Sequence, residues 1–171
     1  MEDAIFQFLE SANEEEMELP MYEKHRPDGS TRFLDKVTKK NIYPVNKSHA
    51  NAMIADTERF EQSAAYVLDG NRNVISFIKN TGLGFGILYQ KNEEQHDYEP
   101  DFIVKIQKTD GSMLNLILET KGYDFNQDVE LKKAVALRWV KAVNQEGSKG
   151  KWDYCLVKDI GSINTEIDKR L

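Results

Sequence analysis

The chain has 171 residues, of which 40% are hydrophobic, and its formal net charge is -6. A chain of this length buries one good core, so we expect a single compact domain. It holds no apolar run of about eighteen residues or more, and its acidic N-terminus is unlike a signal peptide, so we expect a cytoplasmic protein without a membrane span.

The cysteine content and the net charge limit which metal sites and which partners we expect. Cys155 is the only cysteine, which excludes an internal disulfide and a metal cage of thiolates, and its apolar neighbours favour a buried thiol. The negative charge argues against a protein that holds nucleic acid by electrostatic attraction alone. Two explanations would still allow a role on nucleic acid. Either cations bound to carboxylates supply local positive charge, or another domain holds the nucleic acid.

Two segments precede the predicted compact domain. Residues 1–20 contain an amphipathic stretch and an acidic run, which predict a helical or acidic segment without chemistry of its own. Residues 21–49 are polar and contain Pro27, Gly29 and Pro44, so we expect an extended lead-in. The compact domain is predicted over residues 50–171.

The predicted domain combines helices with β-strands. In residues 55–69, Phe60, Ala64 and Leu68 recur at helical spacing, which predicts a first helix. Further along we expect strands over 74–78 and 85–89, an irregular acidic loop over 92–97, strands over 98–107 and 113–121, a helix over 126–144 and a strand over 152–157. The helix between the last two strands suits a crossover connection, so these strands are expected to pair in parallel. The pattern predicts an α/β fold with a central mixed sheet flanked by helices.

The segment from residue 101 to residue 121 is predicted to be an antiparallel hairpin. The turn Thr109-Asp110-Gly111 provides a glycine for the left-handed position of a three-residue loop. In that register, Phe102 faces Leu118, and the whole face around this pair is apolar and belongs on the core. The same register places Asp101 opposite Glu119 on the other face, with Lys121 pointing the same way.

Asp101, Glu119 and Lys121 are therefore the candidate catalytic residues. Directly opposed carboxylates, with Cβ atoms roughly 5 Å apart, repel each other unless a cation lies between them. Mg²⁺ suits such a pair because it binds a few carboxylate oxygens and retains several waters. The alternative is a surface ion cluster at a strand end. We prefer the cation site because the three charges interrupt two otherwise apolar strands at matching ends.

These residues also match a known pattern. The strings YEPDFIV and LNLILETKG resemble the PD-(D/E)xK nuclease signature, with Pro100, Asp101, Glu119 and Lys121 at its positions. The segments HRPDGST, YPVNKSHANAMIADTERFEQSAAYVLD, FIKNTGLGFGI and LKKAVALRWVKAVN extend the likeness over roughly residues 24–158. This region resembles the C-terminal nuclease domain of type III restriction enzyme Res subunits and of helicase-linked relatives.

The resemblance implies a restriction-endonuclease-like core that cuts DNA with Mg²⁺, for which Mn²⁺ can substitute. Asp101 and Glu119 would be metal ligands, the carbonyl of Thr120 an additional ligand, and Lys121 the catalytic lysine. Glu61 matches the acidic residue that many such nucleases place near the metals on the first core helix. A salt bridge from Glu61 to a lysine at the core edge is an equally weighted alternative.

Two lysines of the second predicted helix, Lys132 and Lys133, are candidates for DNA-phosphate contacts because they lie near its N-terminus. An ordinary solvated helix face is the alternative for both. The three histidines, His25, His49 and His96, show no metal-ligand spacing.

The sequence contains no GxxxxGK[ST] phosphate loop, so ATP hydrolysis is not expected in this chain. The expected partners are DNA, an ATP-dependent helicase or translocase domain or subunit, and a methyltransferase or recognition subunit. The chain would be either a domain of a longer polypeptide or a short protein that works with separate chains. Two other functions stay open: a catalytically weak DNA-binding or assembly module, and a nuclease that acts on RNA or branched DNA.

Overall fold

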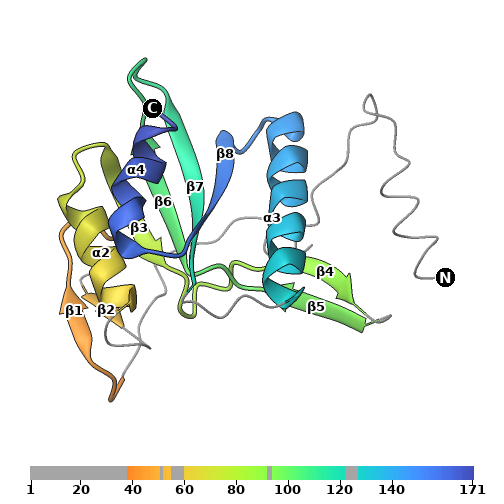
Figure 1. Ribbon diagram of the computed structural model, residues 1–171, viewed down its shortest axis with the longest axis horizontal. Coiled ribbons are helices and arrows are strands. Elements are labelled where there is room, and N and C mark those ends of the chain that lie inside the picture. Colours follow the sequence, from red (N-terminus) through yellow and green to blue (C-terminus); the bar gives the residue numbers. More distant parts are fainter. Residues whose placement is uncertain (1–37, 51, 55–59, 92–93, 122–126) are drawn as a thin grey trace.

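A mixed β-sheet with helices on both faces forms the centre of the protein (Figure 1). The computed structural model describes residues 38–171 apart from residues 51, 55–59, 92–93 and 122–126. Within that part, the central sheet has four strands in the order β3 (Val74–Lys79), β6 (Phe102–Gln107), β7 (Met113–Thr120) and β8 (Lys151–Val157). The β3-β6 and β6-β7 pairs are antiparallel, whereas β7 and β8 are parallel as predicted.

The β6-β7 hairpin has the predicted register. Phe102 pairs with Leu118 and Ile106 pairs with Leu114. Gly111 adopts a φ of 82°, the left-handed conformation expected of the turn glycine. The loop closes as the amide of Lys108 donates to the carbonyl of Ser112 over 2.8 Å.

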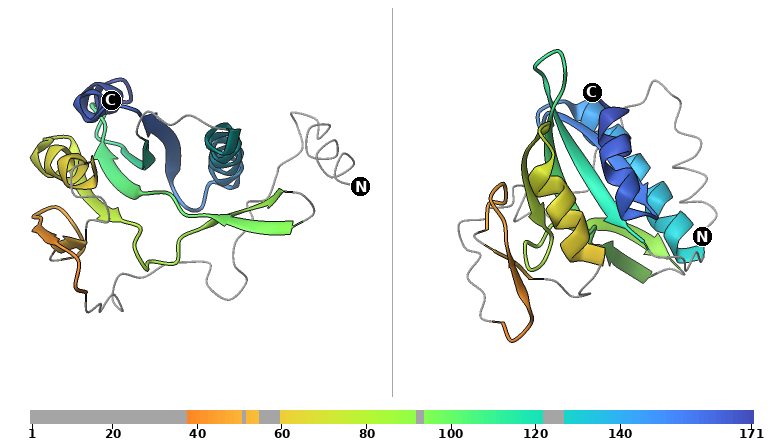
Figure 2. Two further views of the ribbon diagram at one scale, coloured as in Figure 1. Left: turned by 60° about the horizontal axis from the view of Figure 1, so that its bottom comes forward. Right: turned by 60° about the vertical axis from the view of Figure 1, so that its left-hand side comes forward.

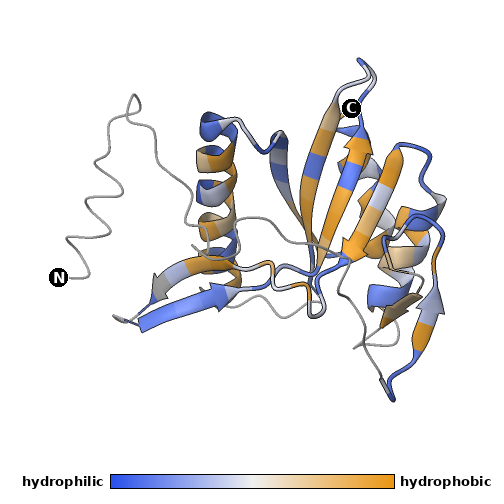
Figure 3. Ribbon diagram, turned by 180° about the vertical axis from the view of Figure 1, so that it is seen from behind, coloured by the Kyte–Doolittle hydropathy of each residue, from blue (hydrophilic) through white to orange (hydrophobic). Residues whose placement is uncertain are grey.

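The two faces of the sheet are covered by different helices, as Figures 1 and 2 show. Helix α2 (Phe60–Gly70) and the short helix α4 (Ile163–Asp168) cover one face, where Leu68 and Ile167 pack with Phe102. Helix α3 (Gln127–Glu146) covers the other face, where Val143 and Trp139 pack with Ile117. The sheet is therefore buried on both sides, and β3, β6 and β7 are mostly hydrophobic in Figure 3.

A second hairpin replaces the irregular acidic loop predicted over 92–97. Strand β4 (Ile87–Lys91) pairs antiparallel with β5 (Glu94–Tyr98), and the hairpin extends away from the central sheet beside α3 (Figure 2). Its core residues Ile87, Tyr89 and Tyr98 are buried, whereas most of β5 is polar and exposed. The prediction failed because β5 contributes only one large buried residue, so its alternation was too weak to recognise.

The ends of the described chain also pack on the core. Strand β1 (Ile42–Pro44), which lies in the predicted lead-in, pairs with β2 (Ala52–Ile54), and Val45 joins the core beneath α2. The segment after residue 158, for which no element was predicted, forms a 3-10 turn η2 (Ile160–Ser162) and then α4. Residues 1–37, with the predicted amphipathic segment and His25, lie outside the described residues. Among those described, no helix is long and apolar enough to span a membrane.

Candidate active site

Asp101 and Glu119 meet at the end of the β6-β7 pair, as the hairpin register predicts. Asp101 immediately precedes β6, and Glu119 is the penultimate residue of β7. The amide of Asp101 donates a hydrogen bond to Oε2 of Glu119 over 3.3 Å. Both side chains are half-buried. The juxtaposition is thus present in the fold, whereas the catalytic role of the pair stays a prediction.

The Asp101 carboxylate is held by the residue that follows its partner. Its Oδ2 accepts hydrogen bonds from the amide of Thr120 at 2.8 Å and from the hydroxyl of Thr120 at 2.6 Å. Burial raises the pKa of Asp101, and these two hydrogen bonds oppose that rise. The charge of Glu61 raises the same pKa further, and that of Lys79 lowers it. Asp101 therefore experiences charges from α2 and β3 and hydrogen bonds from its own hairpin.

The Glu119 carboxylate lies toward α3. The hydroxyl of Tyr98 donates to its Oε2 over 2.9 Å. Burial and, next, the negative charge of Asp101 raise the pKa of Glu119 to about 7, while the hydrogen bonds from Tyr98 and Asp101 oppose the rise. The two carboxylates are thus close enough that their mutual repulsion favours the uptake of a proton or a cation.

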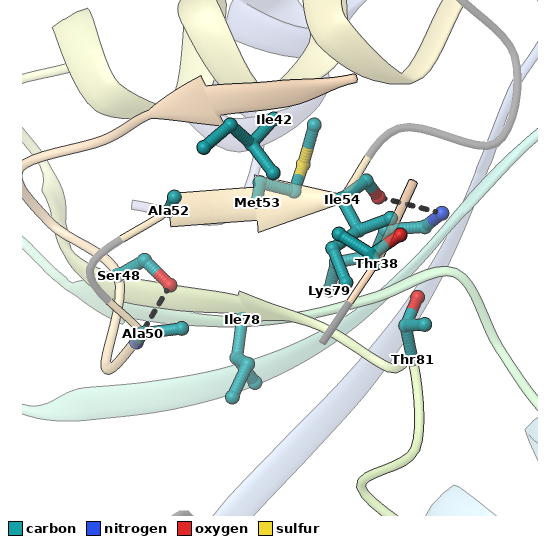
Figure 4. A pocket seen from close by; sticks show the side chains of 10 residues that line it. All are labelled: Thr38, Ile42, Ser48, Ala50, Ala52, Met53, Ile54, Ile78, Lys79 and Thr81. Atoms are coloured by element: carbon teal, nitrogen blue, oxygen red, sulfur yellow. Dashed lines mark hydrogen bonds between the residues drawn. The ribbon is translucent and has the colours of Figure 1, made fainter. Parts of the chain in front are cut away.

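A buried ion pair lies on the α2 side of Asp101. Lys79, the last residue of β3, places its Nζ 2.8 Å from Oε2 of Glu61 in the first turn of α2, and the two side chains are only 7% and 12% exposed. The same Nζ donates to the carbonyl of Ile54 over 3.1 Å, a bond drawn in Figure 4. The salt bridge to a core-edge lysine, one of two alternatives for Glu61, is therefore present, and its metal-ligand role stays a prediction.

Sequence reasoning did not single out Lys79 or Tyr98. The available signal for Lys79 was a lysine that ends the apolar run VISFI. The signal for Tyr98 was an aromatic residue three positions before Asp101. Neither position shows which partner the side chain meets, because Glu61 and Glu119 belong to other elements.

A cavity of about 370 Å³ opens next to Lys79. Figure 4 shows that its lining comes from the β1-β2 hairpin and from the end of β3. Its walls are mixed, with aliphatic side chains such as Ile54 and Ile78 beside the hydroxyls of Ser48 and Thr81. Lys79 lines this cavity, pairs with the Glu61 carboxylate and lowers the pKa of Asp101.

The three predicted cations occupy different positions. The amide of Lys121 donates to the carbonyl of Val157 over 2.9 Å, and within the described residues its side chain forms no ion pair with Asp101 or Glu119. The ammonium of Lys132 lies 5.7 Å from the centre of the Tyr98 ring, and its charge lowers the pKa of Glu119. Lys133 faces solvent and pairs at 3.9 Å with the exposed Glu130.

The donor set suits a hard cation. Hydrogen bonds between described residues use one oxygen of each carboxylate, Oδ2 of Asp101 and Oε2 of Glu119, and leave Oδ1 and Oε1 for another partner. Carboxylate oxygens are the ligands that Mg²⁺ prefers, and Mg²⁺ needs few of them because it retains water. No group of three or more His, Cys, Asp or Glu residues in the described ranges is arranged to hold a metal. A cation held here would have Asp101 and Glu119 as its carboxylate ligands, and the ligand role of the Thr120 carbonyl stays a prediction.

Comparison with known proteins provides no relative from which residue roles could be transferred, because no protein-family model, curated protein or solved structure matches this chain.

Proposed function

We propose that this chain is a Mg²⁺-dependent endonuclease domain that hydrolyses phosphodiester bonds in DNA, with the fold and site of the type III restriction enzyme nucleases that its sequence resembles. The observation that supports it best is the contact between Asp101 and Glu119 at adjoining strand ends. Their repulsion helps to raise the pKa of Glu119 to about 7. A like-charge pair that is partly removed from water is costly, and a bound cation removes that cost.

Each residue of the site has its own proposed role in metal binding or in phosphodiester hydrolysis. Asp101, Glu119 and the carbonyl of Thr120 would hold the ion. A bound Mg²⁺ would lower the pKa of a water molecule and stabilise negative charge on the phosphate. Lys121, which follows β7 directly, would orient the attacking water or a non-bridging phosphate oxygen. Lys132, beside Glu119, adds positive charge where the DNA backbone would approach.

The proposed setting is the cytoplasm, with help from other components. The net charge of -6 is unfavourable for independent DNA binding, and the sequence contains no phosphate loop for ATP. An ATP-dependent helicase or translocase and a methyltransferase or recognition subunit would therefore provide movement and target choice. The isolated chain should cleave weakly and with little sequence preference.

A cleavage panel tests this function. Duplex, single-stranded and branched DNA and RNA are incubated with the chain and Mg²⁺ or Mn²⁺, and the products are resolved on gels. We expect weak, metal-dependent cutting of duplex DNA that is lost in Asp101→Ala. Asp110→Ala is the matched control, because Asp110 is an exposed aspartate in the turn of the same hairpin. No cutting of any substrate, or equal cutting by Asp101→Ala, would contradict the proposal.

The second candidate is a DNA-binding or assembly module that keeps the fold without cleavage. It is favoured by Lys121, which within the described residues forms no ion pair with either carboxylate. Thermal unfolding with and without Mn²⁺ separates the two functions. A nuclease site should be stabilised by Mn²⁺ in the parent and not in Asp101→Ala, whereas a module without a metal site should show no shift in either.

A further inference from the structure

We propose that Tyr98 is a positioning residue that holds the carboxylate of Glu119 in its working orientation, an inference that rests on the proposed function of the site. Tyr98 is the last residue of β5, and its side chain is fully buried. Its hydroxyl donates to Oε2 of Glu119 over 2.9 Å. A buried hydroxyl is costly unless it is hydrogen-bonded, so this contact satisfies Tyr98 and orients Glu119 at once.

The Tyr98 ring is itself held in place from several sides. Ile87 and Tyr89 of β4 pack in the same cluster, and Tyr154 of β8 is close enough to affect the pKa of the Tyr98 hydroxyl. Above the ring lies the ammonium of Lys132, 5.7 Å from its centre. A ring fixed in this way presents its hydroxyl in one direction, which a positioning residue requires.

The same carboxylate oxygen receives a second donor from the neighbouring backbone. The amide of Asp101 donates to Oε2 of Glu119 over 3.3 Å, so Tyr98 and Asp101 hold one oxygen together and leave Oε1 for an ion. A tyrosine hydroxyl is protonated at neutral pH, so Tyr98 is a hydrogen-bond donor there. The β4-β5 hairpin is thereby coupled to the site, although it does not belong to the central sheet.

Mn²⁺ calorimetry on Tyr98→Phe tests the inference. This change keeps the buried ring and removes only the hydroxyl. Because the hydroxyl is one of two donors that orient Glu119, Mn²⁺ affinity should fall roughly tenfold or more without it. Tyr89→Phe is the matched control, because Tyr89 is also a buried tyrosine of this hairpin but packs its ring on His96. Its Mn²⁺ affinity should equal that of the parent.

Cleavage at saturating Mn²⁺ provides a further readout. If Tyr98 acts through the orientation of Glu119, Tyr98→Phe should cut slowly at low Mn²⁺ and regain activity as Mn²⁺ is raised. Equal Mn²⁺ affinities for Tyr98→Phe and the parent, or equal losses in Tyr98→Phe and Tyr89→Phe, would overturn the inference.

A measurement on the metal-free protein keeps this inference separate from the proposed function. Tyr98→Phe should lower the urea midpoint of unfolding in the parent and should not lower it in Glu119→Ala, where the acceptor is gone. Equal shifts in both backgrounds would refute the role of Tyr98. If the parent binds no Mn²⁺, the proposed function fails, and the unfolding comparison still decides whether Tyr98 holds Glu119.

Discussion

Removing one partner of the ion pair between Lys79 and Glu61 should destabilise the protein far more than removing one partner of an exposed ion pair. The change that tests it is Lys79→Met, which keeps much of the side-chain volume and removes the charge. It removes the ammonium that lies 2.8 Å from Oε2 of Glu61, whose side chain is only 12% exposed. Removal of one partner from a buried ion pair costs about 3–5 kcal/mol because the remaining charge loses its counter-ion while it stays buried.

The loss of a hydrogen bond further lowers the stability of Lys79→Met. The Nζ of Lys79 also donates to the carbonyl of Ile54, and a hydrogen bond of this kind contributes about 1 kcal/mol. The total is a large fraction of the roughly 5–15 kcal/mol that stabilises a typical domain. Lys79→Met should therefore unfold at a much lower urea concentration than the parent, whereas the double variant Lys79→Met with Glu61→Leu should recover most of the loss.

Urea unfolding at pH 7, followed by circular dichroism, measures these differences. The matched control is Lys169→Met, which breaks the pair with Glu166 at 2.6 Å, in which the lysine is 62% exposed. An exposed pair contributes about 0–1 kcal/mol, so this variant should unfold close to the parent. Equal midpoints for Lys79→Met and Lys169→Met would show that the Lys79 pair is not buried in solution and would refute the reasoning.

Three further predictions concern the charges of the site. The folded pKa of Glu119, about 7, lies above its ordinary value of 4.5, so the metal-free protein should lose up to about 3 kcal/mol of stability as pH rises from about 4.5 to 7. In urea unfolding at a series of pH values, Glu119→Gln should lose less stability over this range. Equal losses in the variant and the parent would contradict the prediction. Lys121→Ala should abolish plasmid nicking while Mn²⁺ binding stays intact or strengthens, and nicking at the parental rate would show that Lys121 is not catalytic. Lys132→Met should slow cleavage more than Lys133→Met at equal salt, because only Lys132 lies over Tyr98 and lowers the pKa of Glu119; similar losses in both variants would indicate two ordinary phosphate contacts.

The sequence by itself determined the hairpin that carries the candidate site. Apolar residues at alternate positions of two strands must share the buried face, and a three-residue turn with Gly111 permits one register. That register by itself places Asp101 opposite Glu119. The crossover to a parallel β8 was predictable for a similar reason, because a helix of sufficient length separates β7 from β8.

Tertiary structure alone decided the surroundings of that pair. Lys79 meets Glu61, and Tyr98 meets Glu119, across elements whose relative placement depends on how α2 and α3 pack on the sheet. Strand β5 could not be predicted from the sequence, because most of its residues are polar and exposed. It is held by pairing with β4 and by packing of Tyr98 in the cluster with α3. Local patterns report which face of an element is buried, whereas side-chain partners distant in the sequence are set by the packing of whole elements.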